Sequence, residues 1–191
     1  AGDAERAHLA ALLASRQLPV PAEGASHLSA DIGGVRLRWE KHGEFHTCTF
    51  WRQLAQAPEG FGTPPIADVP ADWRAALPGQ WLVGLHVLVL PAPLLRHELP
   101  ASVRGLLDED SLVGARVMDD SAEVYTDFRL YGDGFARWIV VAGDMTPRRL
   151  GRLVQRLQEV ETYRMMALLG LPLAREVGAA LVGAERDLAE V

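Results

Sequence analysis

The sequence GRLVQRLQEVETYRMMALLGLP, residues 151–172, has the apolar spacing of a long amphipathic helix. Apolar residues recur there every three or four positions, which places their side chains on one side of an α-helix. The apolar face consists of Leu150, Leu153, Val154, Leu157, Val160 and Leu168. Glu161 and Arg164 fall where this face should continue. The run therefore predicts a long helix that packs on a core and carries charges beside the packed face.

Local signals mark the expected ends of this helix. Thr146 is a good N-cap, and Pro147 suits the first helical position because an N–H group there would have no partner. Gly170 and Pro172 predict the end of the helix. A second helix is expected to follow and to reach the end of the chain. Residues 146–191 are thus predicted to form the C-terminal helices.

Residues 32–141 show the two-residue alternation of β-strands. Val35, Leu37 and Trp39 alternate with charged residues, and a turn at residues 41–43 joins this strand to the next one. The expected strands are 32–40, 45–50, 81–90, 112–118, 123–130 and 135–141, with short helical segments at 72–77 and 101–109. The last three strands are expected to be antiparallel, because short turns join them.

The chain is interpreted as a single soluble α+β domain, residues 1–191. Residues 1–20 open it with an N-terminal helix, since Asp3 is a plausible cap and leucines follow at helical spacing. We expect an antiparallel or mixed sheet of about six strands within 32–141, helices packed on it, and a long C-terminal helix within 146–191.

Composition limits the class of partner. The 191 residues carry a formal net charge of −6, which argues against the clustered basic face that nucleic-acid binding requires. Cys48 is the only cysteine, so no intramolecular disulfide is possible and a reducing compartment is compatible. No run of about 18 apolar residues and no signal-type leader is present, so we expect no membrane span within the chain.

One strand carries residues that can bind metal. A turn before residue 44 would place Glu44, His46 and Cys48 on one face, opposite Arg38 and Glu40 of the neighbouring strand. Carboxylate, imidazole and thiolate groups are zinc ligands. The same charges would equally pair with one another on a solvated face, and this alternative remains open.

Charged residues also flank the turn near residue 132. They are Asp127, Arg129, Asp133 and Arg137. We expect a charged ladder or a small ion site, with Asp133 most simply a turn residue that accepts backbone N–H bonds. A metal-dependent hydrolase would bring Asp127 into one pocket with Glu44 and His46. These three residues are the predicted metal ligands, and a divalent metal is the possible cofactor.

The long helix contains two charged pairs at i,i+3 spacing. They are Arg156 with Glu159 and Glu161 with Arg164. Their position beside the apolar face predicts that some are partly buried against the sheet or a subunit, where they would fix the helix register or an interface. No phosphate-binding loop, nucleophile elbow, zinc-protease helix or paired CxxC motif is present, so enzymatic activity is left open without support.

Four segments resemble one known family when they are taken in order. They are residues 34–45, 126–129, 133–137 and 151–172. Together they resemble a bacterial family of predicted membrane-anchored proteins, domain of unknown function 3422. The resemblance implies a soluble domain, followed beyond this chain by a helical region and two hydrophobic spans, without an established activity or catalytic residues. The chain departs from the family pattern at Lys41 and Gly43, where Arg and Thr are expected.

Three functions are compatible with these observations. The leading hypothesis is a sensory or scaffolding domain, expected on the cytoplasmic side, of a protein anchored in the bacterial inner membrane, acting by self-association, with ligand binding as a further role left open. The alternative is the cytoplasmic domain of a CorA-like divalent-cation transporter, by analogy of layout alone. A metal-dependent hydrolase ranks last. Homo-oligomers, and a membrane reached through segments outside this chain, are the expected partners; nucleic acid is not.

Overall fold

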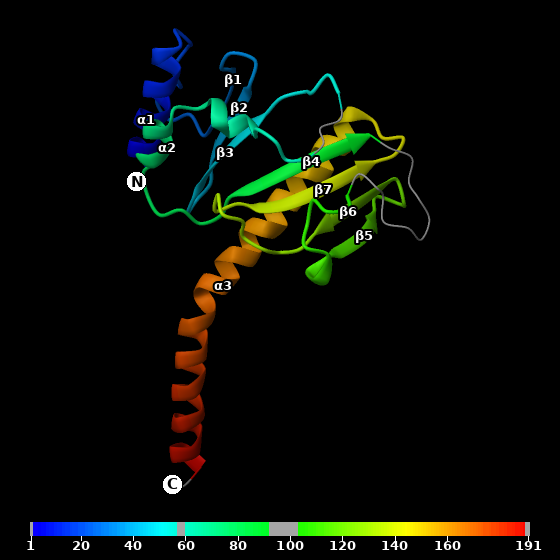
Figure 1. Cartoon of the computed structure of the whole chain (residues 1–191). Coiled ribbons are helices and arrows are strands. Elements are labelled where there is room, and N and C mark those ends of the chain that lie inside the picture. The colour runs from blue at the N-terminus through cyan, green and yellow to red at the C-terminus, as the bar shows by residue number, and fades with distance from the viewer. Residues whose placement is uncertain (1, 57–59, 92–102, 190–191) are drawn as a thin grey trace. The chain divides into compact units, whose positions relative to one another are not determined.

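The computed structural model describes residues 2–56, 60–91 and 103–189. Contacts divide the chain into two compact units, unit 1 (Ala1–Gln80) and unit 2 (Trp81–Val191). Figure 1 labels their helices and strands. Each unit is described by itself, and the interpretation of the whole chain as one domain stays a prediction.

Unit 1 is a small antiparallel sheet packed against a helix. Its elements are α1 (Gly2–Ser15), β1 (His27–Asp31), β2 (Arg36–Lys41), β3 (His46–Trp51), the 3-10 turn η1 (Pro65–Asp68) and α2 (Ala71–Ala75). The strand order is β1-β2-β3. Leu9 and Leu13 of α1 are buried with Leu37 and Trp39 of β2, so the apolar face of the helix closes one face of the sheet.

Unit 2 contains a four-stranded mixed sheet and the long helix. Its elements are β4 (Leu85–Pro91), the 3-10 turn η2 (Glu109–Ser111), β5 (Val113–Val117), β6 (Ala122–Thr126), β7 (Ala136–Ala142) and α3 (Pro147–Ala189). The order is β4-β7-β6-β5, with β4 parallel to β7 and the other pairs antiparallel. Leu153 and Leu157 of α3 pack with Val124, Trp138 and Val140 on one face of this sheet.

The α+β class and the long C-terminal helix are confirmed. Seven strands in two sheets replace the single sheet of about six. The additional strand is β1, which pairs with β2 although His27–Asp31 is largely polar and lacks a clear apolar alternation. Of the short helix expected at 101–109, residues 101–102 lie outside the described residues, residues 103–106 form turns, and η2 begins only at Glu109.

The start of α3 is confirmed and its expected end is wrong. The Thr146 Oγ1 accepts a hydrogen bond from the Arg149 N–H at 3.4 Å, as an N-cap does. The helix then continues through Pro172 to Ala189. A proline removes one helical hydrogen bond, here to the carbonyl of Leu168. Leu168 is exposed, so water can bind that carbonyl and the helix tolerates the loss.

Among the described residues, α3 is also the one helix whose length and composition would allow it to cross a membrane, over Pro147–Val182. None of its most apolar window is buried. The chain therefore contains one described segment that meets this criterion, and the expectation that nothing in it spans a membrane stays a prediction. That expectation relied on an uninterrupted apolar run, whereas Arg175 and Glu176 interrupt a stretch of α3 whose mean hydropathy is nevertheless high.

Candidate functional site

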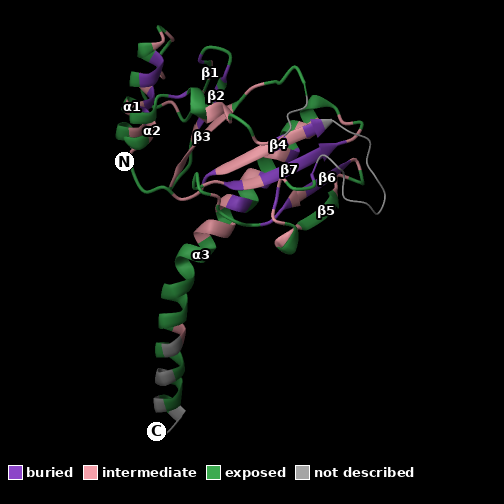
Figure 2. Cartoon of the chain, viewed as in Figure 1, coloured by how far each residue is buried: buried purple, intermediate pink, exposed green. Residues whose placement is uncertain are grey.

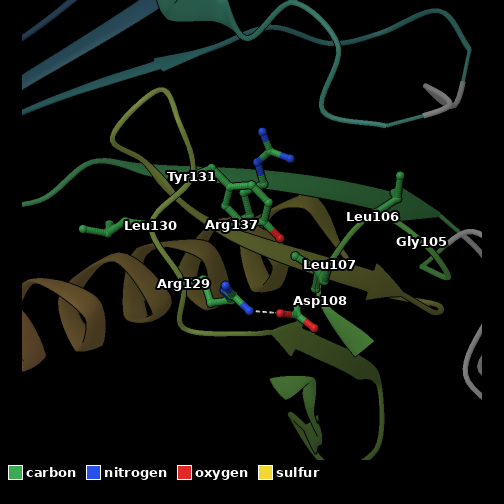
Figure 3. A pocket seen from close by; sticks show the side chains of 8 residues that line it. All are labelled: Gly105, Leu106, Leu107, Asp108, Arg129, Leu130, Tyr131 and Arg137. Atoms are coloured by element: carbon green, nitrogen blue, oxygen red, sulfur yellow. Dashed lines mark hydrogen bonds and ion pairs between the residues drawn. The ribbon is translucent and has the colours of Figure 1, made fainter. Parts of the chain in front are cut away.

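Unit 2 contains an open pocket of about 390 Å³ where β6 ends and β7 begins (Figure 3). Residues 105–108, which precede η2, form one wall. Residues 129–131, just after β6, form another, and Arg137 of β7 completes the lining. The pocket thus combines leucine side chains with two arginines and one aspartate.

Asp127 holds the walls of this pocket together. Asp127 is only 3% exposed. Oδ2 accepts hydrogen bonds from the Asp108 N–H at 3.0 Å and from the Tyr131 hydroxyl at 2.5 Å, while Oδ1 accepts one from the Arg129 N–H at 3.1 Å. Burial, together with the bond to Asp127, raises the pKa of Tyr131 to about 12, so the phenol remains a donor. Asp127 therefore links both walls through a buried acceptor.

The charged side chains of the pocket are paired within unit 2. Arg129 forms an ion pair with the Asp108 carboxylate. The guanidinium of Arg137 stacks on Tyr131, with Cζ 3.7 Å from the ring centroid. Its Nη2 lies 3.9 Å from Asp133 Oδ2. The expected charged ladder is present only in part: Arg137 approaches Asp133, whereas Arg129 pairs with Asp108 and Asp127 accepts from Tyr131 and from backbone N–H groups.

The residue that leads from β6 into the pocket has an unusual backbone conformation. Phe128 has φ of 55°, in the left-handed region that residues other than glycine rarely adopt. Its N–H donates to Thr126 Oγ1 at 3.2 Å. Its ring packs edge-on against Trp138 and lies 5.3 Å from the guanidinium carbon of Arg164. This turn directs Phe128 toward α3 and the following residues into the pocket.

His86 of β4 lies beside Asp133. Its Nε2 is 3.4 Å from Asp133 Oδ2, and its ring stacks on Phe135 with centroids 4.2 Å apart. Burial lowers the pKa of His86, although Asp133 opposes that shift. Asp133 also accepts the Phe135 N–H at 3.0 Å, so its predicted role as a turn residue is confirmed.

The predicted metal ligands of unit 1 occupy a different arrangement from the one expected. Cys48 lies opposite Trp39 and His46 opposite Lys41, so neither faces Arg38 or Glu40. The expected register was wrong by one residue, because the turn extends to Phe45, whose carbonyl accepts the His42 N–H at 2.8 Å. A shift of one residue moves a side chain to the other face.

Each of these residues has its own surroundings. Glu44 is exposed in the turn. The Nδ1 of His46 lies 3.9 Å from Glu5 Oε1 of α1, and burial lowers the pKa of His46. Cys48 packs against the unit 1 core, and burial raises the pKa of its thiol to about 12.

Within the described parts of the chain, no three His, Cys, Asp or Glu residues are grouped so that they could hold a metal ion. Glu44 and His46 belong to unit 1, and Asp127 belongs to unit 2. The three donors to Asp127 occupy much of its acceptor capacity. The metal site of Glu44, His46 and Asp127 stays a prediction, as does a divalent-metal cofactor.

One of the two predicted pairs on α3 is buried. Glu161 is 1% exposed, and Arg164 donates to both of its carboxylate oxygens, at 2.9 and 2.6 Å. Such a two-bond pair is the strongest form of this contact. Glu159 instead accepts a bond from Gln155 Nε2 at 3.1 Å, and Arg156 is exposed. Among the α3 residues whose burial the structure describes, Glu161 is the last that is fully buried.

Beyond Glu161, α3 carries apolar side chains that unit 2 does not cover (Figure 2). Residues 167–177 are all exposed. One face, which we call the distal stripe, is formed by Tyr163, Met166, Gly170, Leu173, Val177 and Leu181. These residues follow one another every three or four positions, so they share one side of the helix. The exposed fractions are 63% for Tyr163, 65% for Leu173 and 50% for Val177.

The fold defines a two-sheet α+β protein with a projecting helix. The chain belongs to the DUF3422 family, described as a protein of unknown function, whose family model matches residues 1–191. No match was found among curated proteins or among solved structures. The resemblance noted in the sequence is thus confirmed at the level of the family.

Proposed function

We propose that this chain is a scaffolding domain that self-associates through the distal stripe of α3. The observation that carries the proposal is a reversal of polarity along the helix. The same side of α3 that holds the distal stripe carries Arg152, Arg156 and Glu159 in the first half, because these residues continue the three- and four-residue spacing backward. A helix that served only unit 2 would remain polar on this side.

The dimensions of the stripe suit a second helix. Residues 163–181 extend about 27 Å at about 1.5 Å per residue. The spacing from Tyr163 to Val177 alternates three and four residues, which is the pattern that lets two helices interlock their side chains. Gly170 within the stripe allows a close approach of the partner helix. A second copy of α3 is therefore the occupant that we propose.

The charges of the second half favour a protein partner over a lipid one. Arg175 and Glu176 lie in the middle of the apolar region, away from the stripe. A helix crossing a bilayer would place both near the hydrocarbon centre, at a cost of about 2.5–3.5 kcal/mol for each charge on insertion scales. In a helix pair they would face water. Anchoring in the bacterial inner membrane, with this domain on the cytoplasmic side, belongs to the proposal only through the family resemblance.

The transport alternative has less support. It needs acidic residues at subunit contacts, and Asp127, Glu159 and Glu161 are the candidates. Asp127 and Glu161 are buried with partners from their own unit. Of the three, only Glu159 is exposed.

Sedimentation velocity over a range of protein concentrations tests the proposal. We expect a reversible oligomer for the unaltered chain and a monomer for Val177→Glu, because a carboxylate cannot be buried without a partner. Leu168→Glu is the matched control, since Leu168 is 47% exposed and lies off the stripe. A chain that stays monomeric and binds phospholipid vesicles would replace self-association with a membrane role. Equal loss of association in both variants would contradict the assignment of the stripe.

A further inference from the structure

The pocket of unit 2 has features that its role in folding does not require. Its lining joins the apolar side chains of Leu106, Leu107 and Leu130 to two guanidinium groups. Leu130 is 59% exposed, and the Arg129 side chain is 61% exposed. Apolar walls with a few converging polar groups are typical of small-molecule sites. The two arginines select for a negatively charged ligand, since guanidinium groups match carboxylate and phosphate geometry.

The pocket is also held in shape before any ligand arrives. The buried Asp127 fixes the backbone of Asp108 and Arg129, and it fixes the hydroxyl of Tyr131. Tyr131 in turn carries the guanidinium of Arg137 on its ring. The strained backbone of Phe128 lies directly before this wall. Preorganised polar groups and a strained neighbouring residue are usual where a site has a function beyond packing.

Asp108 occupies the position that an anion would take. Its Oδ2 pairs with Arg129 Nη1 (Figure 3). Its Oδ1 accepts the Asp110 N–H at 3.0 Å. A guanidinium has five donors, and a single one makes this contact. An incoming carboxylate or phosphate can therefore share Arg129 or displace Asp108 from it. Asp108 behaves as an internal competitor for the ligand.

We infer that the pocket formed by residues 105–108, 129–131 and Arg137 binds a small organic anion, a carboxylate or a phosphate with an apolar body. Arg129 contacts the charged group, Arg137 on the Tyr131 ring adds a positive charge to the lining, and the leucines contact the body. Asp108 sets the affinity by competing for Arg129. This inference is independent of the self-association of α3, because the pocket lies at the β6–β7 end of unit 2 and no helix residue is among the described residues that line it.

A ¹H–¹⁵N NMR titration of the whole chain with benzoate tests the inference, with benzamide as the neutral molecule of the same shape. We expect saturable shifts of the Arg129 and Tyr131 amide signals with benzoate and at least about tenfold weaker effects with benzamide. Phenyl phosphate in a parallel titration shows which anionic group the pocket prefers. Equal responses to benzoate and benzamide would overturn the inference, as would no response to either anion.

Two variants separate binding from mere structural support. Arg129→Gln should weaken benzoate binding by about tenfold or more. Asp108→Asn should strengthen it several-fold, because the amide keeps an acceptor for the Asp110 N–H and no longer pairs with Arg129. Arg152→Gln removes the same charge from the exposed side of α3 and should leave binding unchanged. Weaker binding by folded Asp108→Asn, or an equal effect of both arginine changes, would contradict the assigned roles.

Discussion

The two halves of α3 have the same secondary structure and opposite surroundings. Residues 147–161 pack their apolar side on the sheet of unit 2 and expose charges on the other side. Residues 162–182 expose apolar side chains on that other side, where Tyr163, Leu173 and Val177 replace the charges. Helical spacing alone does not reveal which side is covered or by what. Burial and charge, taken together along the helix, separate a half that belongs to its own unit from a half that is suited to a partner.

The largest expected effect comes from comparing one leucine from each half of α3. Leu157→Ala should destabilise the chain by about 3 kcal/mol, because Leu157 is buried against the sheet. Leu173→Ala should change the free energy of unfolding by less than about 0.5 kcal/mol, because the side chain is exposed in the monomer. Urea unfolding at a concentration below that of self-association measures both. Similar losses in the two variants would erase the distinction between the halves.

The ion pair at the boundary between the halves should give a smaller effect. Arg164→Met leaves the buried carboxylate of Glu161 without its partner, and we expect a loss of about 2 kcal/mol in unfolding free energy. The double variant Glu161→Leu with Arg164→Met should recover most of that loss, since it removes the unpaired charge. Arg156→Met, on the exposed side, is the control. If the single and double variants were equally unstable, the pair would not be the stabilising contact.

Lowering the pH is expected to give the smallest effect. It should reduce the stability of the folded chain and leave the association of the distal stripe unchanged. The folded pKa of His86 is lowered by burial, so below a pH of about 6.5 the unfolded chain binds more protons and stability falls. His46 contributes in the same direction. The distal stripe contains no carboxylate or imidazole, so its association constant should be unchanged between pH 7 and pH 5.5.

Urea unfolding at the two pH values, compared with sedimentation at the same values, measures this difference. His86→Gln should flatten the loss of stability toward acid, while an exposed histidine such as His42 changed to Gln should not. An unchanged slope in His86→Gln would show that another group is responsible.

Local signals explain what the sequence predicted about α3 and what it missed. The cap at Thr146 and the spacing of the leucines depend on neighbours along the chain, and both were predicted correctly. The predicted end of the helix at Pro172 was wrong because the energetic penalty of one proline was treated as decisive. In an exposed helix, water can bind the carbonyl that loses its hydrogen bond. β1 was missed because pairing with β2, and not its own pattern, determines its structure.

Part of the candidate pocket could also be predicted from local sequence signals. Asp127, Arg129 and Arg137 stood out because they flank one turn in the sequence. Asp108 has no such local mark, and its backbone bond to Asp127 spans 19 residues. Tyr131 was assigned only to the turn, since its stacking under Arg137 depends on the distance between two strands. The register error around His46 arose from a turn that is longer than its glycine suggested.

The single thiol of the chain has a practical consequence for these questions. Cys48 is packed against the unit 1 core, and a pKa of about 12 leaves almost no thiolate at neutral pH to attack alkylating or spin-labelling reagents. The unaltered protein is thus expected to react only slowly with such probes. A cysteine introduced in the second half of α3 would therefore be the main reactive thiol. Cross-linking through it would show which side of α3 contacts the second copy of the helix.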